Sequence, residues 1–196
     1  MATANSNRVI GDQVYTKVIG YDAAGNAISG TDGASRTRGI AVAGSVTFTR
    51  PADTTAYTAL DVIGGVSSAI HEVALGVPAG AEVQLDTFEL IVNRTTVPSG
   101  MTSVTVHLYT AAPTAIADNA AFSAAVADRG LYAGSVLMSP IAAVGGGFLY
   151  SFADYAGRKI KLTTSSIFAV LLTTTGFTPL SATEHIFRVR GVDLGA

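Results

Sequence analysis

The residues whose type and spacing come closest to a reactive pair are two aspartates in one connector. Asp53 and Asp61 lie in the stretch FTRPADTTAYTALDVIGG, residues 48–65, between two runs that have the pattern of β-strands. Two carboxylates can act as general acid and base when a cleft holds them about 5–10 Å apart. They can also bind Ca²⁺, which prefers oxygen ligands.

The neighbours of these aspartates favour a structural role instead. Asp53 is followed by two threonines, whose backbone N–H groups can donate to its carboxylate in an Asx-type turn. Pro51 sets the direction in which the chain leaves the strand, and the phenol of Tyr57 can cover an edge of the fold while its hydroxyl bonds to the backbone. We therefore interpret the connector as a frame, with catalysis and Ca²⁺ binding as the alternatives.

The histidines do not suggest a metal site. His71 and His185 each adjoin a glutamate, but neighbouring residues on a strand point to opposite faces. His107 falls on the polar face of an alternating run, and none of the three has a partner at ligand spacing. The glycine-rich run 144–148 leads into a strand pattern rather than a helix, so it lacks the context of a phosphate-binding loop. No nucleophile elbow, zinc-protease motif or P-loop is present. We predict no catalytic, cofactor-binding or metal site, no cofactor and no enzymatic activity.

The composition points to a chain that is partly covered by other subunits. Of its 196 residues, 48% are hydrophobic and 13% are charged, against about 25% charged in an ordinary domain. Part of the apolar surface of the monomer is therefore expected to lie in contacts with other chains. Because the sequence has no cysteine, disulfides and thiolate metal sites are excluded.

The charge and hydropathy patterns exclude two classes of partner. The net charge is -2 and no cluster of lysine and arginine stands out, so no nucleic-acid partner is expected. The longest strongly apolar run, 167–172, is far shorter than the roughly 20 residues that span a bilayer. The first residues have neither the basic end nor the apolar stretch of a signal peptide. No membrane partner is expected.

The first forty residues differ from the rest of the chain. Residues 13–21 have the pattern of one strand, and a glycine- and asparagine-containing turn follows. Residues 29–39 have no apolar periodicity and indicate an adaptable connector. We predict an N-terminal arm over 1–40 and a β-sandwich domain over 41–196.

Short strand patterns separated by turn residues make up the second part. Residues 104–109 alternate, with Thr105, His107 and Tyr109 on the outward face, and a change of phase at Asp86-Thr87 predicts a β-bulge. The run 167–172 is apolar on both faces, which is typical of a central strand covered on both sides.

One segment has the pattern of a short helix. Residues 118–129 offer Asp118 or Asn119 as an N-cap, an alanine-rich interior and a glycine stop. Strands spaced about ten residues apart, with one helix in a long connection, predict an all-β, jelly-roll-like sandwich of two sheets.

Three stretches of the sequence resemble a known group of proteins. TFTRPADTTAYTALDVIG, the central DNAAF, and IFAVLLTTTGFTPLSATEHIFRVRGVDL near the end together resemble small virion proteins encoded among the structural genes of tailed bacteriophages. The resemblance covers about residues 45–194 and leaves the arm outside. It implies a non-enzymatic capsid decoration or cement protein that is assembled in the host cytoplasm and docks on the outer surface of the shell. The implied partners are the major capsid protein and further copies of the chain in a homotrimer, and no active residues carry over from the group.

Two other classes of protein remain open from the sequence. A tail, fibre or adsorption protein would bind host-surface glycans, with Tyr132, Tyr150 and Tyr155 as the available platforms because the chain has no tryptophan. A hydrolase domain is the second alternative. The arm has two readings as well, since its strand could pair with a sheet edge of a neighbouring subunit or join its own sandwich.

Overall fold

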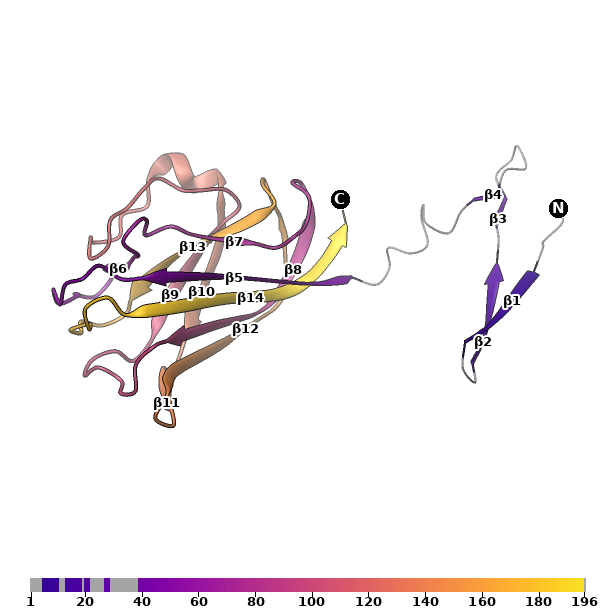
Figure 1. Ribbon diagram of the computed structural model, residues 1–196. Coiled ribbons are helices and arrows are strands. Elements are labelled where there is room, and N and C mark those ends of the chain that lie inside the picture. The colour runs from indigo at the N-terminus through magenta and orange to yellow at the C-terminus, as the bar shows by residue number, and fades with distance from the viewer. Residues whose placement is uncertain (1–4, 11–12, 19, 22–26, 29–38, 196) are drawn as a thin grey trace. The chain divides into compact units, whose positions relative to one another are not determined.

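The structure is a computed structural model that describes residues 5–10, 13–18, 20–21, 27–28 and 39–195 (Figure 1). The chain divides into two units, Met1–Arg38 and Gly39–Ala196. Each is described by itself.

The first unit contains short antiparallel strand pairs. Strand β1 (Asn5–Ile10) pairs with β2 (Gln13–Val18), and β3 (Gly20–Tyr21) pairs with β4 (Ala27–Ile28). The expectation of one strand over 13–21 was wrong, because this run is shared between β2 and β3 and β2 has a hairpin partner. Only two residues separate the paired Ile10 and Gln13, which is the commonest hairpin loop length. The expected connector 29–39 lies outside the described residues apart from Gly39.

The second unit is a sandwich of two antiparallel five-stranded sheets, as predicted (Figure 1). In the β9/β13 sheet the order is β10-β9-β13, and β6 and β7 both pair with the far side of β13. Its strands are β6 (Val62–Ile63), β7 (His71–Ala74), β9 (Val104–Tyr109), β10 (Tyr132–Met138) and β13 (Ser166–Thr173). The order in the β8/β14 sheet is β11-β12-β8-β14-β5. Its strands are β5 (Ile40–Thr49), β8 (Glu82–Val92), β11 (Ala142–Val144), β12 (Phe148–Lys161) and β14 (Glu184–Gly195).

The connectivity is that of a jelly roll once the short β6 and β11 are set aside. In chain order the first strand then pairs with the last, β5 with β14, and the second with the seventh, β7 with β13. The inner pairs are β8 with β12 and β9 with β10. This nested pairing is that of two interleaved Greek keys, and it confirms the predicted jelly-roll-like fold.

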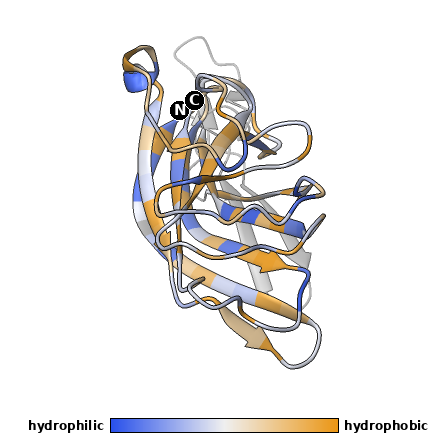
Figure 2. Cartoon of the chain, turned by 90° about the vertical axis from the view of Figure 1, so that its left-hand side faces the viewer, coloured by the Kyte–Doolittle hydropathy of each residue, from blue (hydrophilic) through white to orange (hydrophobic). Residues whose placement is uncertain are grey.

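Alternating side chains place the main core between the two sheets. Hydrophobic and hydrophilic residues alternate along the strands (Figure 2), as expected for sheets with one buried and one open face. In β8 the alternation changes phase at Asp86, where neither β12 nor β14 has a residue opposite. The predicted bulge is therefore confirmed. A Cβ at Gly191 would collide with the carbonyl oxygen of Gln84, so glycine lets β14 pass close to β8 beside this bulge.

Strand β13 is buried on both faces. Ile167, Ala169 and Leu171 belong to the core between the sheets. A second hydrophobic cluster lies on the other face of the β9/β13 sheet. Its buried members are Val62, Ala69, Tyr109, Phe168, Val170 and Leu172. The prediction of a central strand covered from both sides is confirmed.

The predicted helix over 118–129 was wrong. The only helix in this stretch is η2 (Val126–Gly130), a single 3₁₀ turn. Asn119 has a φ of 57°, which a helix does not allow. The backbone of the segment instead bonds to the connector, because Val62 N–H donates to Ala120 O and Phe122 N–H donates to Leu60 O, both at 2.9 Å.

Residues 110–131, which join β9 to β10 and which we call the long connection, explain a second difference from the sequence-based expectation. The side chain of Tyr109 was expected to face solvent, yet it is buried in the second cluster. Residues Ile116, Phe122 and Leu131 of the connection pack against that cluster and close its outer side. The outward face of the sheet is therefore covered by a loop rather than by a helix.

Replacing Phe168 with alanine tests whether the second cluster is a real core. Phe168 is 8% exposed, and removal of such a ring should lower the free energy of unfolding by about 3–5 kcal/mol. Chemical denaturation of Phe168→Ala and of Leu137→Ala makes the comparison, because Leu137 is 56% exposed on β10 and should cost little. Equal losses for the two variants would contradict the buried position of β13.

Candidate functional site

The connector 48–65 is organised around a buried arginine. Arg50 is 1% exposed, directly after the end of β5. Its Nη2 donates to Asp118 Oδ2 at 2.9 Å, and its Nε donates to the hydroxyl of Tyr57. The hydroxyl of Tyr57 in turn donates to Asp118 Oδ1 at 2.6 Å. These three side chains close a network that joins the connector to the long connection before η2.

Asp118 has a further structural task in this network. The backbone N–H of Gly64 donates to Asp118 Oδ1 at 2.7 Å, so both carboxylate oxygens are occupied. A Cβ at Gly64 would lie 2.7 Å from the Cβ of Ala69, so the close approach there requires glycine. Burial, with Asp118 next in importance, raises the pKa of Tyr57 well above its ordinary value, so the phenol stays protonated and acts as a donor.

The two aspartates of the predicted frame are held by their own neighbours. Asp53 Oδ1 accepts the backbone N–H of Thr55 at 3.0 Å, which confirms the predicted Asx turn. This hydrogen bond is the main reason that the pKa of Asp53 is lowered. Asp61 is buried, and its Oδ2 accepts the Thr58 hydroxyl at 2.9 Å and the Thr58 backbone N–H. These local bonds favour the frame over a reactive pair.

Two of the histidines meet beside the same connector. The ring of Phe48 stacks on His71 with 3.7 Å between centroids and on His185 with 5.0 Å. His71 Nε2 donates to Ile63 O at 3.1 Å, and His185 Nδ1 donates to Thr183 O at 3.2 Å, since a carbonyl only accepts. Burial lowers the pKa of His185 to about 4 and also lowers the pKa of His71, so both rings are neutral near pH 7.

The described part of the chain offers no arrangement for metal binding. Within it, no group of three or more His, Asp or Glu side chains is placed to hold an ion. No helix in the same residues has the length and hydropathy to cross a membrane.

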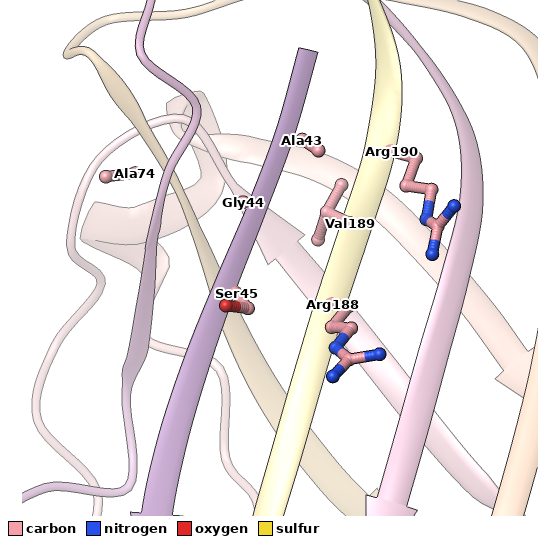
Figure 3. Close-up of a pocket in the computed structure, with 7 residues that line it drawn as sticks. All are labelled: Ala43, Gly44, Ser45, Ala74, Arg188, Val189 and Arg190. Atoms are coloured by element: carbon pink, nitrogen blue, oxygen red, sulfur yellow. The ribbon is translucent and has the colours of Figure 1, made fainter.

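An open pocket of about 480 Å³ lies along β5 and β14 (Figure 3). Its charged members, Arg188 and Arg190, extend from β14 to the side away from β5. Each arginine is paired with Glu89 of β8, at 3.6 Å from Arg188 Nη1 and 3.2 Å from Arg190 Nη2. The other residues that line the pocket are Ala43, Gly44, Ser45, Ala74 and Val189. Because one carboxylate binds both guanidinium groups, this pocket is a charged patch of the sheet rather than a site built for a ligand.

A row of apolar side chains lies next to this charged patch on the outer side of the β8/β14 sheet. Phe148, Phe152 and Val144 are 37%, 41% and 46% exposed. Half-buried Tyr150 lies between the two phenylalanines along β12 and is paired in register with Ile91. We call this surface the aromatic face. Its members are Val144, Phe148, Tyr150 and Phe152.

A hollow of about 360 Å³ opens beside η2 on the other side of the sandwich. Its aromatic members are His107, Tyr109, Phe122 and Tyr132. Its remaining members are Ala124, Ala125, Val126, Asp128 and Arg129. We call it the aromatic hollow.

The three tyrosines that the sequence suggested as platforms have different positions. Tyr132 is 44% exposed at the aromatic hollow, and Tyr150 belongs to the aromatic face. Tyr155 packs edge-on against Phe88, with 5.3 Å between ring centroids, and is partly buried against the main core. The structure therefore separates them and does not form one tyrosine platform.

Comparison with protein-family models and with curated proteins finds no match for the chain.

Replacing Asp118 with asparagine tests the buried network. The variant removes the closer of the two carboxylates beside buried Arg50, since Nη2 lies 2.9 Å from Asp118 and 3.5 Å from Asp53. Breaking a buried pair in this way costs about 3–5 kcal/mol of unfolding free energy. Denaturant unfolding of Asp118→Asn should show this loss. Asp53→Asn is the matched comparison, because the Asp53 carboxylate is the more distant partner of Arg50, at 3.5 Å, and is 45% exposed. Asparagine also keeps the acceptor of the turn. A larger loss for Asp53→Asn than for Asp118→Asn would contradict the assignment.

The buried histidines predict an acid-sensitive fold. The unfolded chain binds a proton on each histidine below about pH 6.5, whereas folded His185 does so only near pH 4. The stability present above pH 6.5 should therefore be lost as the pH falls toward 4, by about 1.4 kcal/mol per pH unit for His185. Denaturant unfolding from pH 7 to 4.5 measures the slope, and His185→Gln should reduce it. A stability that does not fall over this range would show that the ring is readily charged in the folded protein.

Proposed function

We propose that the chain is a non-enzymatic structural protein of a tailed-bacteriophage virion, which docks on the capsid shell and stabilises it. Its partners are the major capsid protein and further copies of the chain. The observation that carries the proposal is the aromatic face, an exposed apolar row on a fold in which Asp61, Asp118 and the histidines 71 and 185 are taken up by structural bonds. The sequence resemblance supports the same assignment.

The aromatic face has the properties of a contact surface. Phenylalanines exposed on one face of a strand, such as Phe148 and Phe152, are costly in water and gain when a partner covers them. Aromatic residues are enriched in the centre of protein interfaces, and charged residues belong to the rim. Phe152 is in register with Glu89, which binds Arg188 and Arg190, so the apolar row has an ionic border on one side. This border supplies directionality to a contact whose energy comes from burial.

The arm supplies a second mode of attachment. Strands β1 and β2 form a hairpin in a unit separate from the sandwich. A hairpin on a tether can add to an open sheet edge of a neighbouring subunit through main-chain hydrogen bonds. We propose that the arm links neighbouring copies or capsomers, while the aromatic face makes the primary contact with the shell.

Co-sedimentation with capsids tests the proposal. Capsids of the encoding phage, prepared without this protein, are mixed with wild type, with Phe148→Ser/Phe152→Ser and with Leu137→Ser as a control on the opposite sheet. The aromatic-face variant should lose at least nine-tenths of its binding, because two exposed anchors are removed. Leu137→Ser should bind as wild type does.

Light scattering on the purified protein should show either a trimer or a monomer that becomes trimeric only on the shell.

Two results contradict the proposal. One is a wild-type protein that does not sediment with capsids at any concentration tested. The other is a folded double variant that binds as tightly as wild type, which would place the contact elsewhere on the chain.

A further inference from the structure

The aromatic hollow is walled by rings from three parts of the chain. His107 and Tyr109 come from β9, Tyr132 from β10 and Phe122 from the long connection. The ring of His107 lies between two others, with centroids 4.8 Å from Phe122 and 5.7 Å from Tyr132. Tyr109 meets Tyr132 edge-on at 5.5 Å. A volume of about 360 Å³ is in the range of small-molecule sites.

The hollow is held in shape from below. Asp128 is buried, and its carboxylate accepts the backbone N–H of Thr114 at 2.9 Å and the Thr114 hydroxyl at 3.1 Å. The backbone carbonyl of Asp128 accepts the N–H of Leu131 at 2.9 Å, next to Tyr132. These bonds fix η2 to the connection that follows β9, and Thr110 N–H, directly after β9, donates to Leu131 O at 2.8 Å. The hollow is therefore formed in advance of any ligand. Preformed sites save the ordering cost of binding.

The polar groups of the hollow belong to its rim. Arg129 is exposed and has no ion-pair partner among the residues that the structure describes. Burial lowers the pKa of His107, so its neutral ring offers one donor and one acceptor at pH 7. Tyr132 adds a hydroxyl at the open side, where its ring is 44% exposed. The surface is therefore apolar and aromatic at its centre, with hydrogen-bonding groups around it.

We propose that the aromatic hollow binds a pyranose ring, such as the terminal sugar of a surface glycan. A pyranose has one face of C–H groups, which pack on aromatic rings, and a perimeter of hydroxyls, which need donors and acceptors. An entirely apolar ligand would leave the rim groups without partners, which is unfavourable. A charged peptide would find only one free cation, Arg129, among the residues that line the hollow.

The position of the hollow suits this role. His107 is on the outward face of the β9/β13 sheet, whereas the aromatic face is on the outward side of the β8/β14 sheet. The two surfaces are thus on opposite sides of the sandwich. A copy attached through the aromatic face would present the hollow to the medium. The inference does not depend on such attachment, because sugar binding by the free protein is measured separately.

An array of glycans with neutral, N-acetylated and acidic pyranoses tests the proposal on the full chain. At least one class should bind, and the methyl glycoside of that sugar should then shift the backbone amide NMR signals of His107, Arg129 and Tyr132. Tyr132→Ala should weaken binding at least tenfold, while Tyr132→Phe, which keeps the ring, should weaken it less. Tyr150→Ala, on the aromatic face, should bind as wild type does.

Three outcomes overturn the proposal. No glycan on the array binds, or the shifted signals fall on the aromatic face, or indole enters the hollow while no glycoside does. Tyr132→Ala should leave capsid co-sedimentation unchanged. A wild-type protein that binds a glycoside but does not sediment with capsids would refute the docking role alone.

Discussion

The fold depends on how one buried charge is satisfied. An arginine removed from water is costly unless every part of its guanidinium finds a partner. Arg50 meets this requirement through Asp118 and Tyr57, with carbonyl oxygens of Asp53 and Leu180 at 3.4 Å. Asp118 lies 68 residues further along the chain. The pair therefore adds to the backbone hydrogen bonds that join residues 60–62 to residues 119–122. The long connection is thereby held over the β9/β13 sheet, where it completes the second hydrophobic cluster and forms one wall of the aromatic hollow. The second hydrophobic cluster and one wall of the aromatic hollow therefore both depend on this ion pair.

The other buried polar groups are also hydrogen-bonded within the fold, so they are not part of the surfaces that are open to partners. Three polar residues near the connector are buried: Asp61, His71 and His185. Asp61 accepts a hydrogen bond from Thr58, whereas the two histidines donate to the carbonyl oxygens of Ile63 and Thr183. Perturbed histidines are often signs of an active site, but here the cause is burial next to Phe48. What remains open to partners is apolar and aromatic. The two surfaces on opposite sides of the sandwich therefore suit binding roles, and they leave room for two different partners at once.

Local patterns predicted the parts of the fold that local physics determines. The change of phase at Asp86 and the two-sided burial of 167–172 follow from the alternation of side chains along a strand. The helix over 118–129 did not form, because alanine propensity is a weak preference that long-range bonds of Asp118 and the backbone of residues 60–62 overcome. No local pattern indicated the pairing of Arg50 with Asp118, because the two residues are 68 positions apart. The burial of Tyr109 depends on a loop that covers it, and the periodicity of a strand does not predict the path of a loop. The one local hint was Arg50, a charged residue directly after a strand pattern, which could have indicated a buried partner.

We propose a capsid-bound structural protein that uses one side of its sandwich for attachment. A density map of the intact virion, with the sandwich fitted at the resolution of strands, tests this most directly. We expect density on the outer surface of the shell, with β11 and β12 against the major capsid protein and β9, β10 and η2 facing the medium. Density for the chain confined to the tail, or a capsid copy attached through the β9/β13 side, would contradict it.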